Sequence, residues 1–217
     1  MRCFFFIAGM ERYAATLTGL TTRKGEKMSE NISDKLAGAL ALAIARNPRA
    51  NLQQIAKKAG ISKATLYRIA PTREAIIVLL LERATRHLEQ ALFSAELARA
   101  PYPDALIRLT ENVIVGRDFY MFWNAAQWVQ MVDDRKDAVD EAMPSFYGEA
   151  LEEFFKKGQK EGAFRIDMPA RWLAKAYDSM LYAAVDSALR GEIAPVDMAA
   201  LVNSMFLNGA SSETEKG

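Results

Sequence analysis

The chain has 217 residues, of which 51% are hydrophobic and 25% are charged, and this globular composition excludes a disordered or collagen-like protein. Its single cysteine, Cys3, excludes an intramolecular disulfide, and its single histidine, His87, excludes a zinc site built from Cys and His within one chain. Glycine and proline are few beside Ala, Leu, Glu, Lys, Arg and Met, which favours helices over hairpins. We therefore expect an all-α protein in a reducing, cytoplasmic environment, with no metal and no cofactor.

The net charge of +1 conceals an uneven distribution along the chain. Residues 28–70 carry seven basic and two acidic residues, a net charge of +5, and residues 1–27 add a further +3. Residues 71–217 carry 16 basic and 23 acidic residues, a net charge of −7. A basic segment beside an acidic remainder favours a surface that binds nucleic acid, attached to an acidic body that the phosphates repel. The alternative is an ordinary fluctuation of charge along the chain.

The first 27 residues precede a second methionine, Met28, after which a polar lead runs into a helical pattern. The apolar run near Met1 is too short to span a bilayer, and no clear small-x-small cleavage site follows it closely. We expect translation to start at Met28 and residues 1–27 to be an extension with little fixed structure; a secretory signal is the alternative. No later segment is long and uncharged enough for a transmembrane helix, so no membrane partner is expected.

Hydrophobic spacing predicts three helices between residues 28 and 74. The apolar residues of the first recur every four positions before Asn47-Pro48 and are Ile32, Leu36, Leu40 and Ile44. Asn51 is a good N-cap for a short second helix, which Gly60 ends at a tight turn. Ser62 can cap a third helix, which Pro71 closes. Two short helices across a minimal turn are typical of a helix-turn-helix.

The third predicted helix commits only Leu66 and Ile69 to the core. Its other residues are small, hydroxylated or basic, as a helix needs to enter the major groove and to bind phosphates and base edges. A solvated face of an ordinary helical protein is the alternative. The candidate DNA contacts that these residues offer are Ser62, Lys63, Ala64, Thr65, Tyr67 and Arg68, together with Gln53 at the amino end of the second helix.

The run NLQQIAKKAGISKATLYRIAPTREAIIVLLLE, residues 51–82, resembles the amino-terminal domain of the TetR family of bacterial transcriptional regulators. The matching positions are Ile55-Ala56, Ala59-Gly60-Ile61-Ser62, Thr65-Leu66-Tyr67 and Thr72-Arg73-Glu74-Ala75. The chain departs from the family at Arg68-Ile69-Ala70, where a histidine or tyrosine followed by a phenylalanine is usual. It also departs at residues 47–51, where Gly and Thr are usual.

The resemblance implies a three-helix DNA-binding domain over residues 28–74, a larger helical ligand-binding and dimerisation domain over residues 75–210, and a polar tail over residues 211–217. The residues that it implies on phosphates are Gln53, Thr65, Tyr67, Thr72 and Arg73. Those that it implies at or near the base edges are Lys63, Ala64 and Arg68.

Aromatic residues gather in the helices that enclose the inducer cavity in the resembled family. An apolar pocket with a few polar groups would suit a small organic ligand, and plain core packing is the alternative. The pocket candidates are Phe119, Tyr120, Trp123, Gln127, Trp128, Tyr147 and Phe154.

The last two predicted helices span about residues 169–190 and 196–208 and carry a wide apolar face. In the resembled family this helix pair docks against its counterpart in a second subunit, which implies a homodimer. Packing of both helices inside one protomer is the alternative. The interface candidates are Tyr177, Leu181, Ala184, Ala188, Val202, Met205 and Phe206.

The sequence predicts a DNA-binding transcriptional regulator, a repressor that a small-molecule effector releases from a pseudo-palindromic double-stranded operator. The first alternative is a helical adaptor or small-molecule-binding protein that acts through protein partners. An enzyme is disfavoured, because the chain offers no second histidine, no G-x-S-x-G elbow and no phosphate loop.

Overall fold

The computed structural model describes residues 32–132 and 146–211, without the side chains of residues 127–132. Within these ranges the fold is all-α, as predicted, and its single β contact is an isolated bridge between Phe164 and Ser211. The expected extension over residues 1–27 and the polar tail after Ser211 lie outside the described residues. In the part of the chain that is described, no helix is long and apolar enough to cross a membrane.

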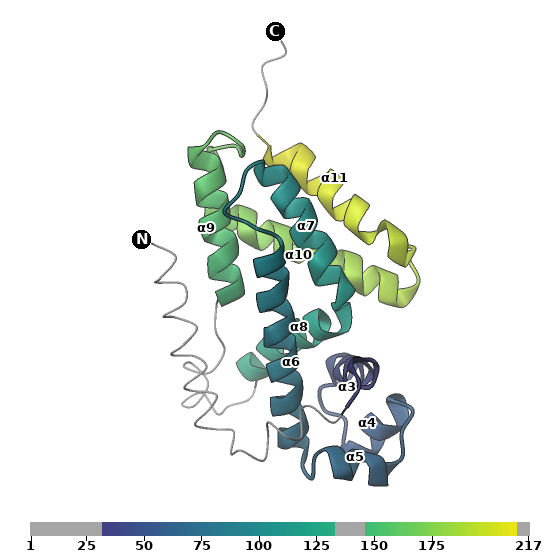
Figure 1. Cartoon of the computed structure of the whole chain (residues 1–217). Helices are drawn as coiled ribbons and strands as arrows, with labels where there is room; N and C mark the ends of the chain where they lie inside the picture. The colour runs from purple at the N-terminus through teal and green to yellow at the C-terminus, as the bar shows by residue number, and fades with distance from the viewer. Residues whose placement is uncertain (1–31, 133–145, 212–217) are drawn as a thin grey trace.

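Three short helices form the head at the lower end of Figure 1: α3 (Asp34–Arg46), α4 (Leu52–Lys58) and α5 (Lys63–Ile69). Each begins at a polar N-cap, and those of α4 and α5, Asn51 and Ser62, are the ones that the sequence predicts. Ser33 accepts a hydrogen bond from the Leu36 amide, and Asn51 forms a reciprocal capping box with Gln54. Helix α5 ends at Ala70, whose backbone is extended as expected for the residue before Pro71.

Helix α6 (Arg73–Ser94) runs from the head into the body as one continuous element (Figure 1). The Thr72 hydroxyl caps its start by accepting a hydrogen bond from the Ala75 amide at 3.1 Å. Along one side of this helix Leu80, Ala84 and Leu88 are fully buried. A single helix therefore joins the basic head to the body.

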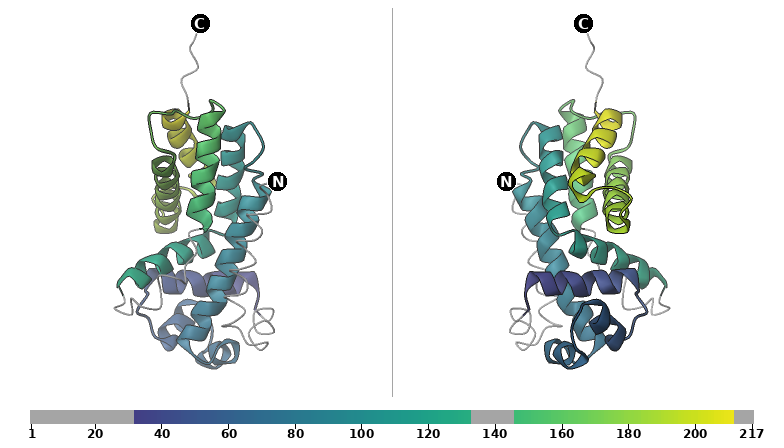
Figure 2. Two further views of the ribbon diagram at one scale, coloured as in Figure 1. Left: turned by 90° about the vertical axis from the view of Figure 1, so that its left-hand side faces the viewer. Right: turned by 90° about the vertical axis from the view of Figure 1, so that its right-hand side faces the viewer.

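Five further α-helices build the body around this connection. They are α7 (Tyr102–Val115), α8 (Arg117–Val132), α9 (Phe146–Lys160), α10 (Ala170–Arg190) and α11 (Met198–Ala210), with the short 3-10 helix η2 (Pro195–Asp197) before α11. Figure 2 shows α10 and α11 together at one side of the body, with α6 at the opposite side. The last two predicted helices are thus confirmed within a few residues of their expected ends.

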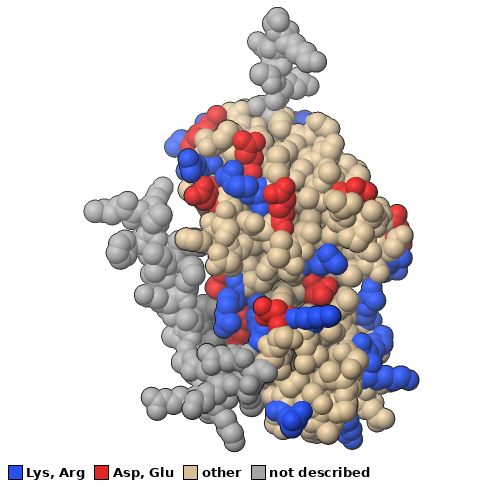
Figure 3. Space-filling view, turned by 45° about the vertical axis from the view of Figure 1, so that its right-hand side comes forward, with Lys and Arg blue, Asp and Glu red and all other residues tan. Residues whose placement is uncertain are grey.

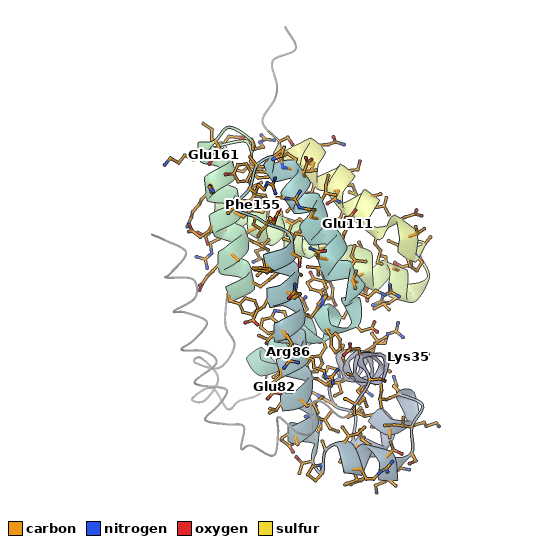
Figure 4. All side chains as sticks on the ribbon, viewed as in Figure 1. Lys35, Glu82, Arg86, Glu111, Phe155 and Glu161 are labelled. Atoms are coloured by element: carbon orange, nitrogen blue, oxygen red, sulfur yellow. The ribbon has the colours of Figure 1, made fainter. Side chains whose placement is uncertain are left out.

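An aromatic cluster fills the core of the body around Phe155, which Figure 4 places between α9 and α7. Its ring centroid lies 4.9 Å from that of Phe164, 5.5 Å from that of Phe206 and 6.4 Å from that of Tyr177. These edge-on and tilted pairs join α9 to α10 and α11 and suit the aromatic quadrupole. A side chain at Gly158 would collide with the Phe164 ring, so glycine is needed there for close approach.

The head packs directly on the body through α3, which lies against α8. A Cβ atom at Gly38 in α3 would lie 3.1 Å from the Asp118 Oδ2 atom in α8. Below this contact, the guanidinium of Arg83 in α6 donates to the Asp34 carboxylate at 2.5 Å and to the Ile32 carbonyl at 2.8 Å. Helix α3 is therefore held from two sides, by α8 and by α6.

Candidate functional site

The turn between α4 and α5 has the geometry that the sequence predicts for a helix-turn-helix. Gly60 adopts a positive φ of 73°, and the Ile61 amide donates to the Ala56 carbonyl at 3.0 Å. The Ser62 hydroxyl then accepts from the Thr65 amide at 3.0 Å and caps α5. Ile55 and Leu66 are fully buried on the inner sides of the two helices. The pair is thus fixed by its own core, which leaves the outer side of α5 free to bind.

The outer side of α5 presents four of the predicted DNA contacts together. Lys63, Ala64 and Arg68 are exposed, and the Tyr67 side chain is 44% exposed. The Lys63 ammonium lies 5.4 Å from the centre of the Tyr67 ring, one turn further along the helix. In Figure 3 lysine and arginine side chains lie along the head at the lower end, and the visible acidic side chains lie higher. This surface combines cations, a phenol and a small residue on one helix, as a major-groove helix requires.

Four of the five remaining predicted contacts, Ser62, Thr65, Thr72 and Arg73, form hydrogen bonds near the head. The hydroxyl groups of Ser62 and Thr65 lie 2.9 Å apart, and Thr72 caps α6. The Arg73 guanidinium donates to the Pro48 carbonyl and so braces the connection between α3 and α4. Gln53 is exposed in the first turn of α4. Phosphate contacts by these side chains stay a prediction, and a hydroxyl that caps a helix still has a proton to donate.

The pocket candidates whose side chains are described lie in several clusters of the body. Phe154 belongs to the aromatic cluster, where its ring lies 5.1 Å from that of Phe155. Phe119 is half-buried beside His87, and Trp123 packs edge-on against Phe146 at 5.4 Å. The side chains of Gln127 and Trp128 lie outside the described residues. Phe154 and Trp123 act in this structure as core residues, which was the alternative to a pocket role.

Two other pocket candidates, Tyr120 and Tyr147, belong to a buried polar cluster with Asp178. The Tyr120 hydroxyl donates to the Asp178 carboxylate at 2.7 Å, and the Tyr147 hydroxyl is buried without a hydrogen-bond partner among the described residues. Burial raises the pKa of Asp178, and the hydrogen bond from Tyr120 only partly opposes this shift. Burial, followed by the charge of Asp178, also raises the pKa of Tyr120.

Comparison with known proteins places these features in a family. The family model for "Bacterial regulatory proteins, tetR family" matches residues 36–80. These residues cover most of α3, all of α4 and α5, and the start of α6. The HTH-type transcriptional regulator NfxB of Pseudomonas aeruginosa is 34% identical over 179 residues, which make up 82% of this chain and 94% of NfxB. The chain belongs to the TetR family.

Solved structures of TetR-family and related proteins share the fold. LfrR from Mycobacterium smegmatis aligns with a TM-score of 0.61 at 19% identity over 87% of this chain and 98% of LfrR. The same protein in complex with proflavine aligns with a TM-score of 0.58 at 19% identity, over 85% and 97% of the two chains. A protein from Saccharomonospora viridis in complex with choline aligns with a TM-score of 0.55 at 22% identity, over 82% and 97%.

The structure of this TetR-family chain corrects the predicted dimer face. Tyr177 and Leu181 are 0% exposed, Val202 is 2% exposed and Phe206 is 4% exposed within a single chain, so these four residues belong to the protomer core. The reason is that their stripes on α10 and α11 point inwards, where Phe206 and Tyr177 pack against Phe155.

A different set of side chains forms the outer apolar face of α10 and α11. Met205 is 64% exposed, Leu201 and Tyr182 are also exposed, and Ala184 and Ala188 are half-buried. A shallow hollow between the end of α10 and α11 is lined in part by Ile193, Leu201 and Met205. Of the predicted interface residues, only Ala184, Ala188 and Met205 are accessible to a second subunit.

Asp178 is the site residue that the sequence reasoning missed. The buried stripe of α10 includes Ala174 and Val185, and Asp178 stands one turn after Ala174 and two turns before Val185. An acidic residue at such a position of an amphipathic helix borders the core. The spacing of Asp178 from Ala174 and Val185 is therefore a signal in the sequence, but a stripe defined by apolar residues alone does not include it.

Proposed function

We propose that this TetR-family chain is a transcriptional repressor that binds a pseudo-palindromic operator as a homodimer and is released by a small organic effector. The observation that carries the proposal is the outer side of α5, where Lys63, Tyr67 and Arg68 project from a capped, well-packed helix. Such an element reads the major groove, and basic side chains beside it bind phosphates. The proposal makes the protein a DNA-binding regulator and not an enzyme, acting in the cytoplasm, where bacterial DNA lies.

The homodimer is supported by the exposed apolar face of α10 and α11. Met205, Leu201 and Tyr182 expose large apolar groups on neighbouring turns, and the half-buried Ala184 and Ala188 permit close approach of another helix. One short recognition helix offers few base contacts, so two heads on two half-sites supply the affinity that a single head lacks.

Release by an effector is supported by the continuity of α6. Its first residues adjoin α5, and its later residues pack against α7, α8 and α9 of the body. A ligand that favours one position of α6 in the body would change the separation of the two heads away from the roughly 34–36 Å of one DNA turn. A ligand with equal affinity for both arrangements would release nothing. The complexes of two relatives of the same fold, with choline and with proflavine, support an effector of small organic size.

The test is a salt series with DNA selected by the full-length protein from the genome that encodes it. Fluorescence anisotropy should give an affinity for the selected duplex that falls steeply between 50 and 200 mM salt, as counterion release requires. Lys63→Gln should flatten the slope, and the matched control Lys175→Gln on the exposed side of α10 should leave it unchanged. A salt-independent affinity, or equal effects of both variants, would contradict the DNA-binding proposal and favour the adaptor.

A further inference from the structure

We propose that Asp178, Tyr120 and Tyr147 form the anchor of the effector site and that this anchor binds a protonated organic amine. The inference rests on the proposed effector-controlled function and adds the chemical class of the effector. The three residues come from three different helices, α8, α9 and α10, and α10 packs against both of the others.

Asp178 has no cation beside it among the described residues. Its carboxylate accepts a hydrogen bond from the Tyr120 hydroxyl at 2.7 Å, and the Tyr120 hydroxyl also lies 3.0 Å from the Asp178 carbonyl. Among the described residues no lysine, arginine or histidine forms an ion pair with it. Asp178 is partly buried, and its carboxylate is desolvated enough to raise its pKa. A desolvated carboxylate without a counter-ion is costly, and it is retained where it serves a ligand or a proton.

Tyr147, on α9, adds a buried phenol to this part of the body. Its side chain is only 4% exposed, and its hydroxyl has no hydrogen-bond partner among the described residues. The helices that carry the two residues, α9 and α10, pack against each other. Burial raises the pKa of Tyr147, and its interactions with Tyr177 and then with the Asp178 charge raise it further. A buried hydroxyl without a partner costs free energy that a bound donor would recover.

Asp178 and Tyr147 differ from the hydrogen-bonded polar groups of the core around Tyr177. The nearby Tyr177 hydroxyl is satisfied by the Thr110 hydroxyl at 3.0 Å, and Thr110 in turn contacts the Asn203 side-chain oxygen at 2.7 Å. That network joins α7, α10 and α11 and is complete without a ligand. By comparison, among the described residues the Tyr147 hydroxyl has no hydrogen-bond partner and the Asp178 carboxylate has no cation.

The chemistry of the anchor selects a protonated amine over other ligands. An ammonium group supplies the charge that Asp178 lacks and N–H donors for both the carboxylate and the Tyr147 oxygen. A neutral alcohol supplies a donor without the charge, and an anion would meet the carboxylate directly. Charge-assisted hydrogen bonds in a buried site are about twice as strong as neutral ones, so the preference should be measurable with small fragments.

The experiment measures binding of three molecules of one shape to the full-length protein: benzylamine, benzyl alcohol and benzoate. Ligand-observed NMR at pH 7.5 should give a benzylamine affinity at least tenfold tighter than that of benzyl alcohol, and no binding of benzoate. Asp178→Asn keeps the shape and the acceptor for Tyr120, and it should remove the tenfold preference. Tyr147→Phe should weaken benzylamine several-fold with little effect on benzyl alcohol.

The control is Asp186→Asn. Asp186 lies about two turns after Asp178 on α10, and its carboxylate pairs with Arg190. This variant should leave all three affinities unchanged. As a readout without any ligand, Asp178→Asn should raise the melting temperature, because it removes a partly buried carboxylate that has no cation among the described residues. Circular dichroism should stay that of the wild type. The proposed amine anchor would be overturned if benzylamine failed to bind or bound no more tightly than benzyl alcohol. A preference for benzylamine that survives Asp178→Asn would overturn it as well. Operator binding is measured separately, so a protein that binds DNA but ignores benzylamine would refute this inference alone.

Discussion

The guanidinium of Arg46, at the end of α3, donates a hydrogen bond to the carbonyl of Leu189, in the last turn of α10, at 2.8 Å. The two residues are 143 positions apart and join the head to the helix that carries Asp178 and part of the outer apolar face. The last carbonyls of a helix lack intrahelical partners and carry partial negative charge, so a cation is well placed there. This hydrogen bond therefore connects α10 of the body directly to α3 of the head.

Removal of this link should loosen the head while leaving the fold intact. Arg46→Ala should cost about 0.5–1.5 kcal/mol of unfolding free energy, the usual net value of one hydrogen bond. Hydrogen exchange should become faster in the last turn of α3. Arg49→Ala is the matched control, because it removes the same charge from an exposed side chain of the same head. Identical exchange in both variants would show that Arg46 contributes charge alone.

Tyr67 and Lys63 should weaken DNA binding in different ways. Tyr67→Phe removes a hydroxyl that we expect on a phosphate, at a cost of about 0.5–1.5 kcal/mol for all sequences alike. Lys63→Ala should cost roughly 1–3 kcal/mol and relax the preference at one base pair. Competition binding against operator and random duplexes separates the two effects. Equal losses on both duplexes for both variants would contradict this division of labour.

Met205 should contribute to the subunit interface and Phe206 to the fold. Met205→Glu places a charge on the exposed face of α11, so the chain should stay folded but sediment as a monomer with reduced operator affinity. Phe206→Ala should instead destabilise each protomer by about 3–5 kcal/mol, because its ring packs against Phe155 and Tyr177. Phe93→Glu, on the 80% exposed side chain of α6, is the control and should remain dimeric. A Met205→Glu dimer would place the interface on another face.

His87 should make the folded state less stable in acid. Its ring nitrogen lies 3.1 Å from the Val113 carbonyl oxygen, and burial lowers its pKa below 6.5, an effect that this hydrogen bond only partly offsets. Between 6.5 and the lowered pKa the unfolded chain binds the proton and the folded chain does not, so stability falls as pH decreases through this window. Chemical denaturation from pH 7.5 to 5 should show this loss in the wild type and a smaller one in His87→Gln. Parallel curves for the two proteins would exclude His87 as the source.

Gly38 should be needed for the close contact between α3 and α8. Gly38→Ala gains up to about 1 kcal/mol of helix propensity but brings a methyl group 3.1 Å from Asp118, so its net effect should be small. Gly38→Leu should overpack this contact and destabilise the protein by about 1–3 kcal/mol. Thermal unfolding of both variants tests the pair. A Leu variant as stable as the Ala variant would show that α3 can move away from α8 without cost.

The sequence by itself determined the local features of the head. Asn51, Gly60, Ser62 and Pro71 act on backbone within a few residues, so the caps, the turn and the end of α5 could be predicted from residue type and spacing. The exposure of Lys63, Tyr67 and Arg68 followed for the same reason, because a short helix with two core residues leaves its other side outside.

Only the tertiary structure decided the roles of residues in the body. An apolar stripe shows that one side of a helix is buried, but not whether it faces its own protomer or another, so Tyr177 and Phe206 were assigned to the interface and belong to the core. For the same reason the sequence did not predict the hydrogen bond between Asp178 and Tyr120, which lie 58 residues apart. Such pairings depend on how separate helices pack, and no local spacing along the chain encodes that packing.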